Sequence, residues 1–149
     1  MKNIPEGFES ITPYLVLKDA AGAIELYTAA FGATSVNRLM MPGSDKIMHA
    51  CLQIGTSKIF LCDESPEQGM LGPDGPDRGP RFYVYFDNLN EQHRQAVSAG
   101  MTEVSAPMEM FWGDAMSVLQ DPYGVNWSLA AHVRDVSEEE MAEAMAQMG

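Results

Sequence analysis

Ile11-Thr-Pro-Tyr-Leu-Val-Leu17 is an apolar run, and a similar run, Arg81-Phe-Tyr-Val-Tyr-Phe86, follows it about 70 residues later. Each run leads into a helix N-cap signal, Asp19 in the first case and Asp87-Asn88 in the second, and each expected helix ends at a glycine. A period of this length is too long for a solenoid repeat. It predicts a duplicated module, in which two copies bury each other's apolar faces and leave a shared cleft.

Each half of the chain predicts one strand, one helix and then three strands. Module one, residues 8–63, is expected to contain a strand over 11–17, a helix over 19–31 and strands over 35–41, 46–54 and 57–63. Module two, residues 81–132, is expected to contain a strand over 81–86, a helix over 88–99 and strands over 102–106, 116–120 and 125–131. The fold class is therefore α+β, as one domain over residues 1–149.

Two segments lie outside the modules. Residues 64–80 hold four prolines and four glycines without periodicity, which predicts a mobile linker that folds over the cleft. Ser137-Glu-Glu-Glu140 is a capping box that predicts a C-terminal helix over 137–148, packed on the body or on a second subunit.

Composition excludes several functions. The net charge of −12 repels polyanions, so we expect no nucleic-acid partner. The chain has no run of 18 or more apolar residues, so we expect no membrane span. Its first residues lack an apolar core, so we expect no secretory signal. Two cysteines are too few for a disulfide framework, which favours a reducing, cytoplasmic location.

Four stretches resemble the vicinal oxygen chelate superfamily, which includes glyoxalase I, bleomycin-resistance proteins and extradiol dioxygenases, and its PhnB-like branch in particular. They are Ile11-Thr-Pro-Tyr-Leu-Val-Leu-Lys-Asp19, Met48-His-Ala50, Phe111-Trp-Gly-Asp114 and Asp121-Pro-Tyr-Gly-Val-Asn-Trp-Ser-Leu-Ala-Ala-His132. The resemblance covers residues 8–141. It implies two βαβββ modules that pair into an open curved β-barrel around a cleft. Because relatives often pair two chains, it also implies a homodimer.

Metal-using relatives hold one divalent ion with four inward side chains, and those positions align with Thr12, Phe60, Arg81 and Ser128, with Tyr83 as a nearby alternative. None of these side chains is a good ligand for Zn²⁺, Ni²⁺ or Fe²⁺. We therefore expect no metal cofactor. A cluster of His49, Cys51 and Cys62 is an alternative site for a soft divalent metal, and the competing interpretation is two buried thiols and a hydrogen-bonded histidine.

Strand alternation predicts which side chains face the cleft. The expected lining combines ring faces and hydrogen-bonding groups: Thr12, Tyr14, Phe60, Cys62, Arg81, Tyr83, Tyr85, Trp112, Asn126 and Ser128. An inward Arg81 would need an anionic partner, either Asp114 or a ligand carboxylate or phosphate, and a surface position is the alternative. His93 and His132 are expected to be structural.

A lining of this kind suits a small planar or amphipathic ligand. We therefore expect a metal-independent small-molecule-binding protein. One alternative is a metal-dependent lyase or isomerase of the glyoxalase type. Another is a dimeric structural or regulatory protein with no ligand.

Overall fold

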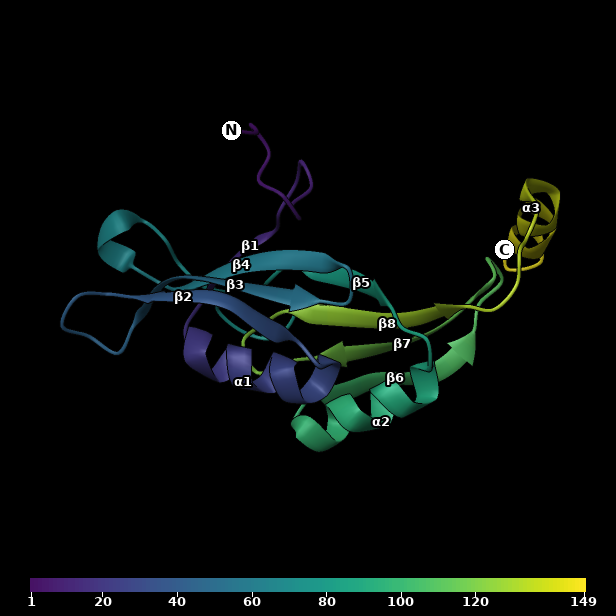
Figure 1. The fold of residues 1–149 in the computed structure, drawn as a ribbon. Helices are drawn as coiled ribbons and strands as arrows, with labels where there is room; N and C mark the ends of the chain where they lie inside the picture. The colour runs from purple at the N-terminus through teal and green to yellow at the C-terminus, as the bar shows by residue number, and fades with distance from the viewer.

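The computed structural model describes residues 1–149 and contains two mixed four-stranded sheets (Figure 1). The first sheet has the order β1-β4-β3-β2, with β1 parallel to β4. The elements of module one are β1 (Tyr14–Leu17), α1 (Ala20–Phe31), β2 (Thr34–Met40), β3 (Ile47–Ile54) and β4 (Ser57–Asp63).

The second sheet repeats this plan, with the order β5-β8-β7-β6 and β5 parallel to β8. Its elements are β5 (Arg81–Tyr85), α2 (Leu89–Ala99), β6 (Thr102–Glu109), β7 (Asp114–Gln120) and β8 (Asn126–His132). The duplicated module is thereby confirmed. The sheets stay open and do not close into a barrel.

Strand β6 runs three residues beyond its expected end and contains Pro107. Proline breaks a central strand because it has no N–H to donate, but β6 lies at the sheet edge and pairs only with β7. Pro13 has a similar place, because it directly precedes β1. Both helices begin as predicted: Asp19 Oδ1 accepts a hydrogen bond from the N–H of Gly22 (3.0 Å), and Asn88 Oδ1 accepts one from Glu91 (3.1 Å).

The two modules meet through their helices. In Figure 1, α1 and α2 lie next to each other on one side of the two sheets, and they are in contact. Two side chains of α2 join them: Gln92 Nε2 donates to the carbonyl of Ala30 (2.6 Å) and Gln95 Nε2 donates to the carbonyl of Ala29 (2.8 Å). Both carbonyl groups are in the last turn of α1, where the helix itself leaves carbonyl groups without a partner.

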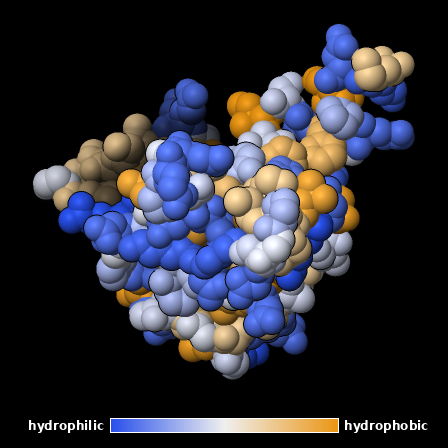
Figure 2. Space-filling view, turned by 90° about the vertical axis from the view of Figure 1, so that its left-hand side faces the viewer, coloured by the Kyte–Doolittle hydropathy of each residue, from blue (hydrophilic) through white to orange (hydrophobic).

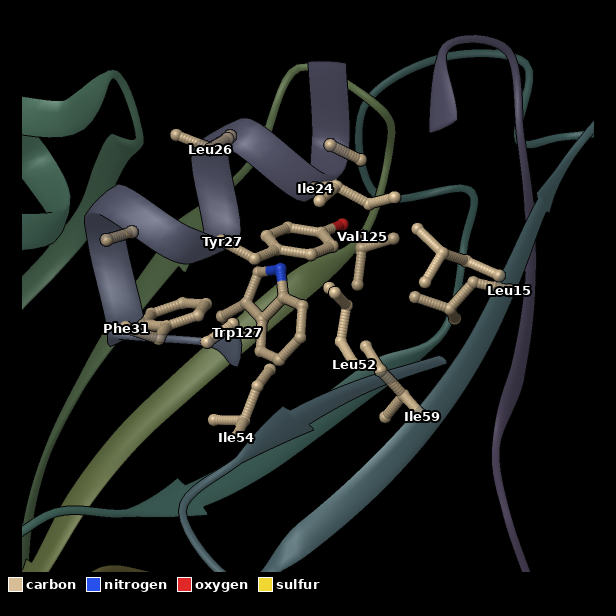
Figure 3. Packing of buried hydrophobic residues seen from close by; sticks show 14 of the residues in the cluster. Leu15, Ile24, Leu26, Tyr27, Phe31, Leu52, Ile54, Ile59, Val125 and Trp127 are labelled. Atoms are coloured by element: carbon tan, nitrogen blue, oxygen red, sulfur yellow. The ribbon is translucent and has the colours of Figure 1, made fainter. Parts of the chain in front are cut away.

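One hydrophobic core of 23 buried residues extends through both modules. At its centre the indole ring of Trp127, on β8, packs against Tyr27 and Phe31 of α1, with ring centroids 5.0 and 4.8 Å apart (Figure 3). Leu52 and Ile54 from β3 lie next to the same indole. Phe82 of module two also packs on the indole, with ring centroids 5.2 Å apart. Because Trp127 of module two packs against residues of module one as well, the two modules share this core.

Residues 64–80 follow a defined path along the body. The segment contains a short 3₁₀ helix, η1 (Pro66–Gln68), and an isolated bridge between Ser65 and Met70. Further on, the N–H of Gly79 donates to the carbonyl of Gly124 (2.9 Å) in the β7–β8 turn. This hydrogen bond holds the end of the segment against the turn between the last two strands of module two.

The C-terminal helix α3 (Glu138–Ala146) has no buried residue and projects away from the rest of the chain (Figure 1). The prediction that it packs on the body is wrong, and packing on a second subunit stays a prediction. Its cap is as expected, since Ser137 Oγ accepts a hydrogen bond from the N–H of Glu140 (3.1 Å). None of the helices is both long and apolar enough to cross a membrane. The face shown in Figure 2 is largely hydrophilic, with apolar residues in small groups.

Candidate functional site

Two tyrosines of β5 lie on the sheet face away from α2 and share one carboxylate. The hydroxyls of Tyr83 and Tyr85 both donate to Oδ2 of Asp114, at 2.7 and 2.9 Å. Asp114 begins β7 and is only 4% exposed, whereas Tyr83 and Tyr85 are 43% and 60% exposed. Their ring centroids are 5.4 Å apart in an edge-to-face arrangement. The hydroxyls are thus fixed while the rings face solvent, which makes a preorganised aromatic platform.

Trp112 extends this platform. Its indole Nε1 lies 3.4 Å from the hydroxyl of Tyr83, to which it donates, and its ring packs edge-to-face on Phe111 with centroids 5.0 Å apart. The turn that carries both residues depends on Gly113, whose φ is +103°. A Cβ at Gly113 would lie 2.3 Å from the carbonyl oxygen of Arg134, so glycine is required for the chain after β8 to approach this turn.

His132, the last residue of β8, is paired with Asp114 across the sheet. Its Nδ1 donates to Oδ1 of Asp114 (2.8 Å), and its Nε2 lies 2.8 Å from Oδ1 of Asp135. Both oxygens of Asp114 are therefore occupied, one by the two tyrosines and one by the imidazole. The expectation of a structural role for His132 missed this connection to the aromatic face.

The hydrogen bonds shift the pKa values of all four groups. Burial opposes the charge on Asp114, but the bonds from His132, Tyr83 and Tyr85 outweigh it and lower its pKa. The bond to Asp135, together with that to Asp114, raises the pKa of His132. Burial and the nearby Asp114 raise the pKa of Tyr83 to about 12, and the bond to Asp114 followed by burial raises that of Tyr85. Asp114 is therefore an anion, and both tyrosines stay neutral at physiological pH.

A groove of about 330 Å³ lies beside β5 and is within the size range of small-ligand sites. Tyr83 and Tyr85 line one wall, Phe8 and Thr12 of the N-terminal segment line another, and the β3–β4 hairpin around Lys58 adds to it. Since β5 is an edge strand that pairs only with β8, its other edge has backbone groups free for hydrogen bonds.

A second aromatic group lies on the first sheet. Tyr14, His49 and Phe60 form a cluster with ring centroids 4.7–5.8 Å apart, and Phe8 packs on Phe60. The hydroxyl of Tyr14 lies 3.2 Å from Nδ1 of His49. Tyr14 and Cys62 line a different hollow, near η1.

The other predicted lining residues divide between surface and interior. Arg81 is on the surface, where its Nη2 contacts both oxygens of Asp77 at 2.6 and 2.7 Å, so Asp77 and not Asp114 is its partner. Asn126 is 2% exposed, and its Oδ1 has no hydrogen-bond partner. Ser128, opposite Tyr83 in the sheet, is partly buried. The structure thus brings together only some of the predicted residues, chiefly Tyr83, Tyr85, Trp112 and Thr12.

His93 has the structural role predicted for it. It is 5% exposed, and its ring nitrogens lie 2.8 Å from Ser117 Oγ and 2.6 Å from Glu103 Oε1. These contacts join α2 to β7 and β6, because the three residues come from those elements.

Four positions hold a divalent ion in metal-using relatives. The side chains at these positions in this chain are unsuited to binding a divalent ion. Phe60 packs among aromatic rings, Arg81 presents a cation paired with Asp77, and Thr12 and Ser128 offer only neutral hydroxyls. The structure gathers no group of three or more His, Cys, Asp or Glu side chains suited to a metal, and this includes the alternative with His49, Cys51 and Cys62.

Comparison with known proteins gives a consistent family assignment. A sequence model of the Glyoxalase/Bleomycin resistance protein/Dioxygenase superfamily matches residues 8–129. An uncharacterised protein of Mycobacterium bovis is 34% identical over 145 residues, which cover 94% of each chain.

Two solved structures show the same fold. TioX from Micromonospora sp. ML1 is similar with a TM-score of 0.67 and 20% identity, over 84% of this chain and 99% of TioX. A PhnB protein from Bacillus cereus is similar with a TM-score of 0.59 and 16% identity, over 83% of this chain and 99% of its own. At these identities the likeness concerns the fold alone.

Proposed function

Because the chain belongs to the glyoxalase/bleomycin resistance/dioxygenase superfamily, whose members perform many chemistries on one fold, we propose its function from the site. The chain is a metal-independent small-molecule-binding protein. It takes a planar ligand in the groove beside β5, with the ligand ring against Tyr83 and Tyr85.

The main support for this binding function is that one buried carboxylate anchors two exposed tyrosine rings. Ordering a free side chain on binding costs about 0.5–1.5 kcal/mol, and here the hydrogen bonds to Asp114 have already ordered both. A tyrosine whose hydroxyl is occupied offers its ring face as the remaining contact. The platform therefore favours a flat apolar group over a ligand that is rich in hydrogen-bond donors.

We also propose a homodimer. Strand β2 is exposed along its whole length, and Leu39 (56% exposed) and Met108 (59% exposed) leave large apolar side chains on the edge strands β2 and β6. The helix α3 buries nothing within its own chain and carries Met145, which is 59% exposed. A second copy would cover such surfaces, and light scattering of the eluted protein at twice the 16.3 kDa chain mass would support it.

Calorimetric titration with 2-naphthamide, an uncharged planar probe, tests the binding function. The full chain, treated with chelator and dialysed, should bind it saturably. Tyr85→Ala should weaken binding about 2- to 10-fold, because one aromatic contact contributes about 0.5–1.5 kcal/mol. Tyr14→Ala is the matched control, since Tyr14 is a similarly exposed tyrosine (47%) on the other sheet.

Two results would contradict the proposal. Binding that appears only after a divalent metal is added would favour the metal-dependent lyase or isomerase. Binding that is weakened by Tyr14→Ala and unchanged by Tyr85→Ala would place the ligand on the first sheet.

A further inference from the structure

The imidazole of His132 lies between two carboxylates of very different exposure. Its Nδ1 is bound to Asp114, whose side chain is 6% exposed, and its Nε2 is bound to Asp135, whose side chain is fully exposed. Asp114 belongs to a sheet strand, whereas Asp135 belongs to the irregular segment between β8 and α3. One partner is therefore fixed, and the other can leave without breaking any strand pairing.

The fixed partner determines the chemistry of the ring. A histidine that donates from Nδ1 to a buried carboxylate carries its lone pair on Nε2 when it is neutral. Enzymes use this arrangement for general bases, because the carboxylate holds the ring orientation and stabilises the imidazolium that forms when Nε2 takes a proton. The side chain of His132 is 52% exposed, so Nε2 is accessible once Asp135 moves away.

The dyad and the aromatic platform share the same anchor. Asp114 binds His132 through Oδ1 and both tyrosines through Oδ2, so the imidazole lies at the hydroxyl ends of the two rings. Nε2 points away from Asp114 towards Asp135, so a planar ligand would reach it by extending past the hydroxyl ends of the rings. Proximity of this kind is a requirement for proton transfer, which needs direct hydrogen-bond reach or one bridging water.

We propose that the Asp114–His132 pair is a proton-transfer site for ligands bound on the tyrosine platform, with His132 as general base, Asp114 as its positioning residue and Asp135 as a removable cap. This inference rests on the proposed binding function. The charged and titratable groups facing His132 are Asp114 from β7, Asp135 from the tail and, through Asp114, the two tyrosines of β5. The neighbouring Arg134 pairs with Glu140 instead, at 3.8 Å.

The ring-opening of 5-nitrobenzisoxazole isolates this step, because the probe is planar and needs only a base. Nε2 takes the proton from the C3 carbon, the C–H electron pair completes a nitrile, and the N–O bond breaks with its pair on oxygen. The product is a coloured cyanophenolate, and the imidazolium returns its proton to water. No metal, oxidant or second substrate takes part.

The experiment measures the ring-opening rate against pH for the full chain and three variants. The wild-type rate should exceed that of equimolar free imidazole by at least about tenfold, since a positioned base commonly gives more. His132→Gln should reduce it to the uncatalysed background. Asp135→Asn should raise the rate at pH 7 and move the midpoint of the pH profile to lower pH, because it removes the cap. Asp74→Asn, a change at another exposed carboxylate (96%), should alter neither.

Two outcomes would overturn the proposal. A His132→Gln protein with the wild-type rate would show that another group is the base. An Asp135→Asn protein no faster than free imidazole would show that an uncapped His132 is no base, and this variant should fold because Asp135 is on the surface. Titration with 2-naphthamide separates the two proposals: binding without ring-opening refutes only the proton-transfer site, and loss of both contradicts the binding function as well.

Discussion

Replacing Asp121 with alanine should strongly destabilise the protein, because this carboxylate joins the two modules. Asp121 is 5% exposed and lies in the turn between β7 and β8. Its Oδ2 accepts hydrogen bonds from the hydroxyl of Tyr27 in α1 (2.6 Å) and from Nε1 of Trp127 (3.0 Å). Its Oδ1 accepts from the N–H groups of Tyr123 and Val125, both at 2.9 Å.

The magnitude follows from the donors left without a partner. Tyr27, Trp127 and Val125 are fully buried, so water cannot replace the lost acceptor at those three groups. An unpaired buried donor costs about 1–3 kcal/mol, and three at the lower half of this range give about 4 kcal/mol. For a chain of this size 1 kcal/mol corresponds to about 2–4 °C, so Tm should fall by about 8–16 °C.

Urea unfolding followed by circular dichroism measures this change, with an unchanged m-value as the check that the same surface unfolds. Asp121→Asn should lose less than alanine does, because its remaining amide oxygen still accepts. Asp74→Ala, at an exposed carboxylate, should change stability by less than about 0.5 kcal/mol. An Asp121→Ala protein within about 1 kcal/mol of wild type would contradict this expectation, because it would show that these donors find other partners.

Three further outcomes are expected. Cys51 and Cys62 should resist iodoacetamide in the native protein, because burial raises the pKa of both thiols; fast labelling seen by intact mass would contradict this. Arg81→Ala should change the free energy of unfolding in urea by less than about 1 kcal/mol, since its pair with Asp77 is exposed, and a larger loss would indicate a structural ion pair. His132 has a raised pKa, so the stability it adds over His132→Gln should be complete below pH about 6.5 and decline as the pH rises through the folded-state pKa. Thermal melts measure this difference, and a stability advantage of the wild type over His132→Gln that grows with pH would contradict the prediction.

The fold could be predicted because its signals are local. Hydrophobic alternation over 57–63 gave the bounds of β4 directly, and the capping residues Asp19 and Asn88 gave the starts of both helices. These features depend on neighbours in the chain, and a single sequence contains them.

The site was harder to predict because its contacts are long-range. Strand alternation placed Tyr83 and Tyr85 on the correct face, but it could not show that both hydroxyls reach Asp114, about 30 residues away. Alternation also predicted that Asn126 lines the cleft, but it could not show that this residue is buried at the start of β8. The one available signal was the resemblance motif ending in Asp114, together with His132 at the end of the last strand, since cross-strand register would have paired them.

Chemical-shift mapping of the chelator-treated, ¹⁵N-labelled full chain with 2-naphthamide tests the central claim most directly. We expect perturbations concentrated in β5, at the indole N–H of Trp112 and in the N-terminal segment around Thr12, without added metal. Perturbations confined to the cluster around Tyr14 and Phe60, or present only after a divalent metal is added, would contradict it.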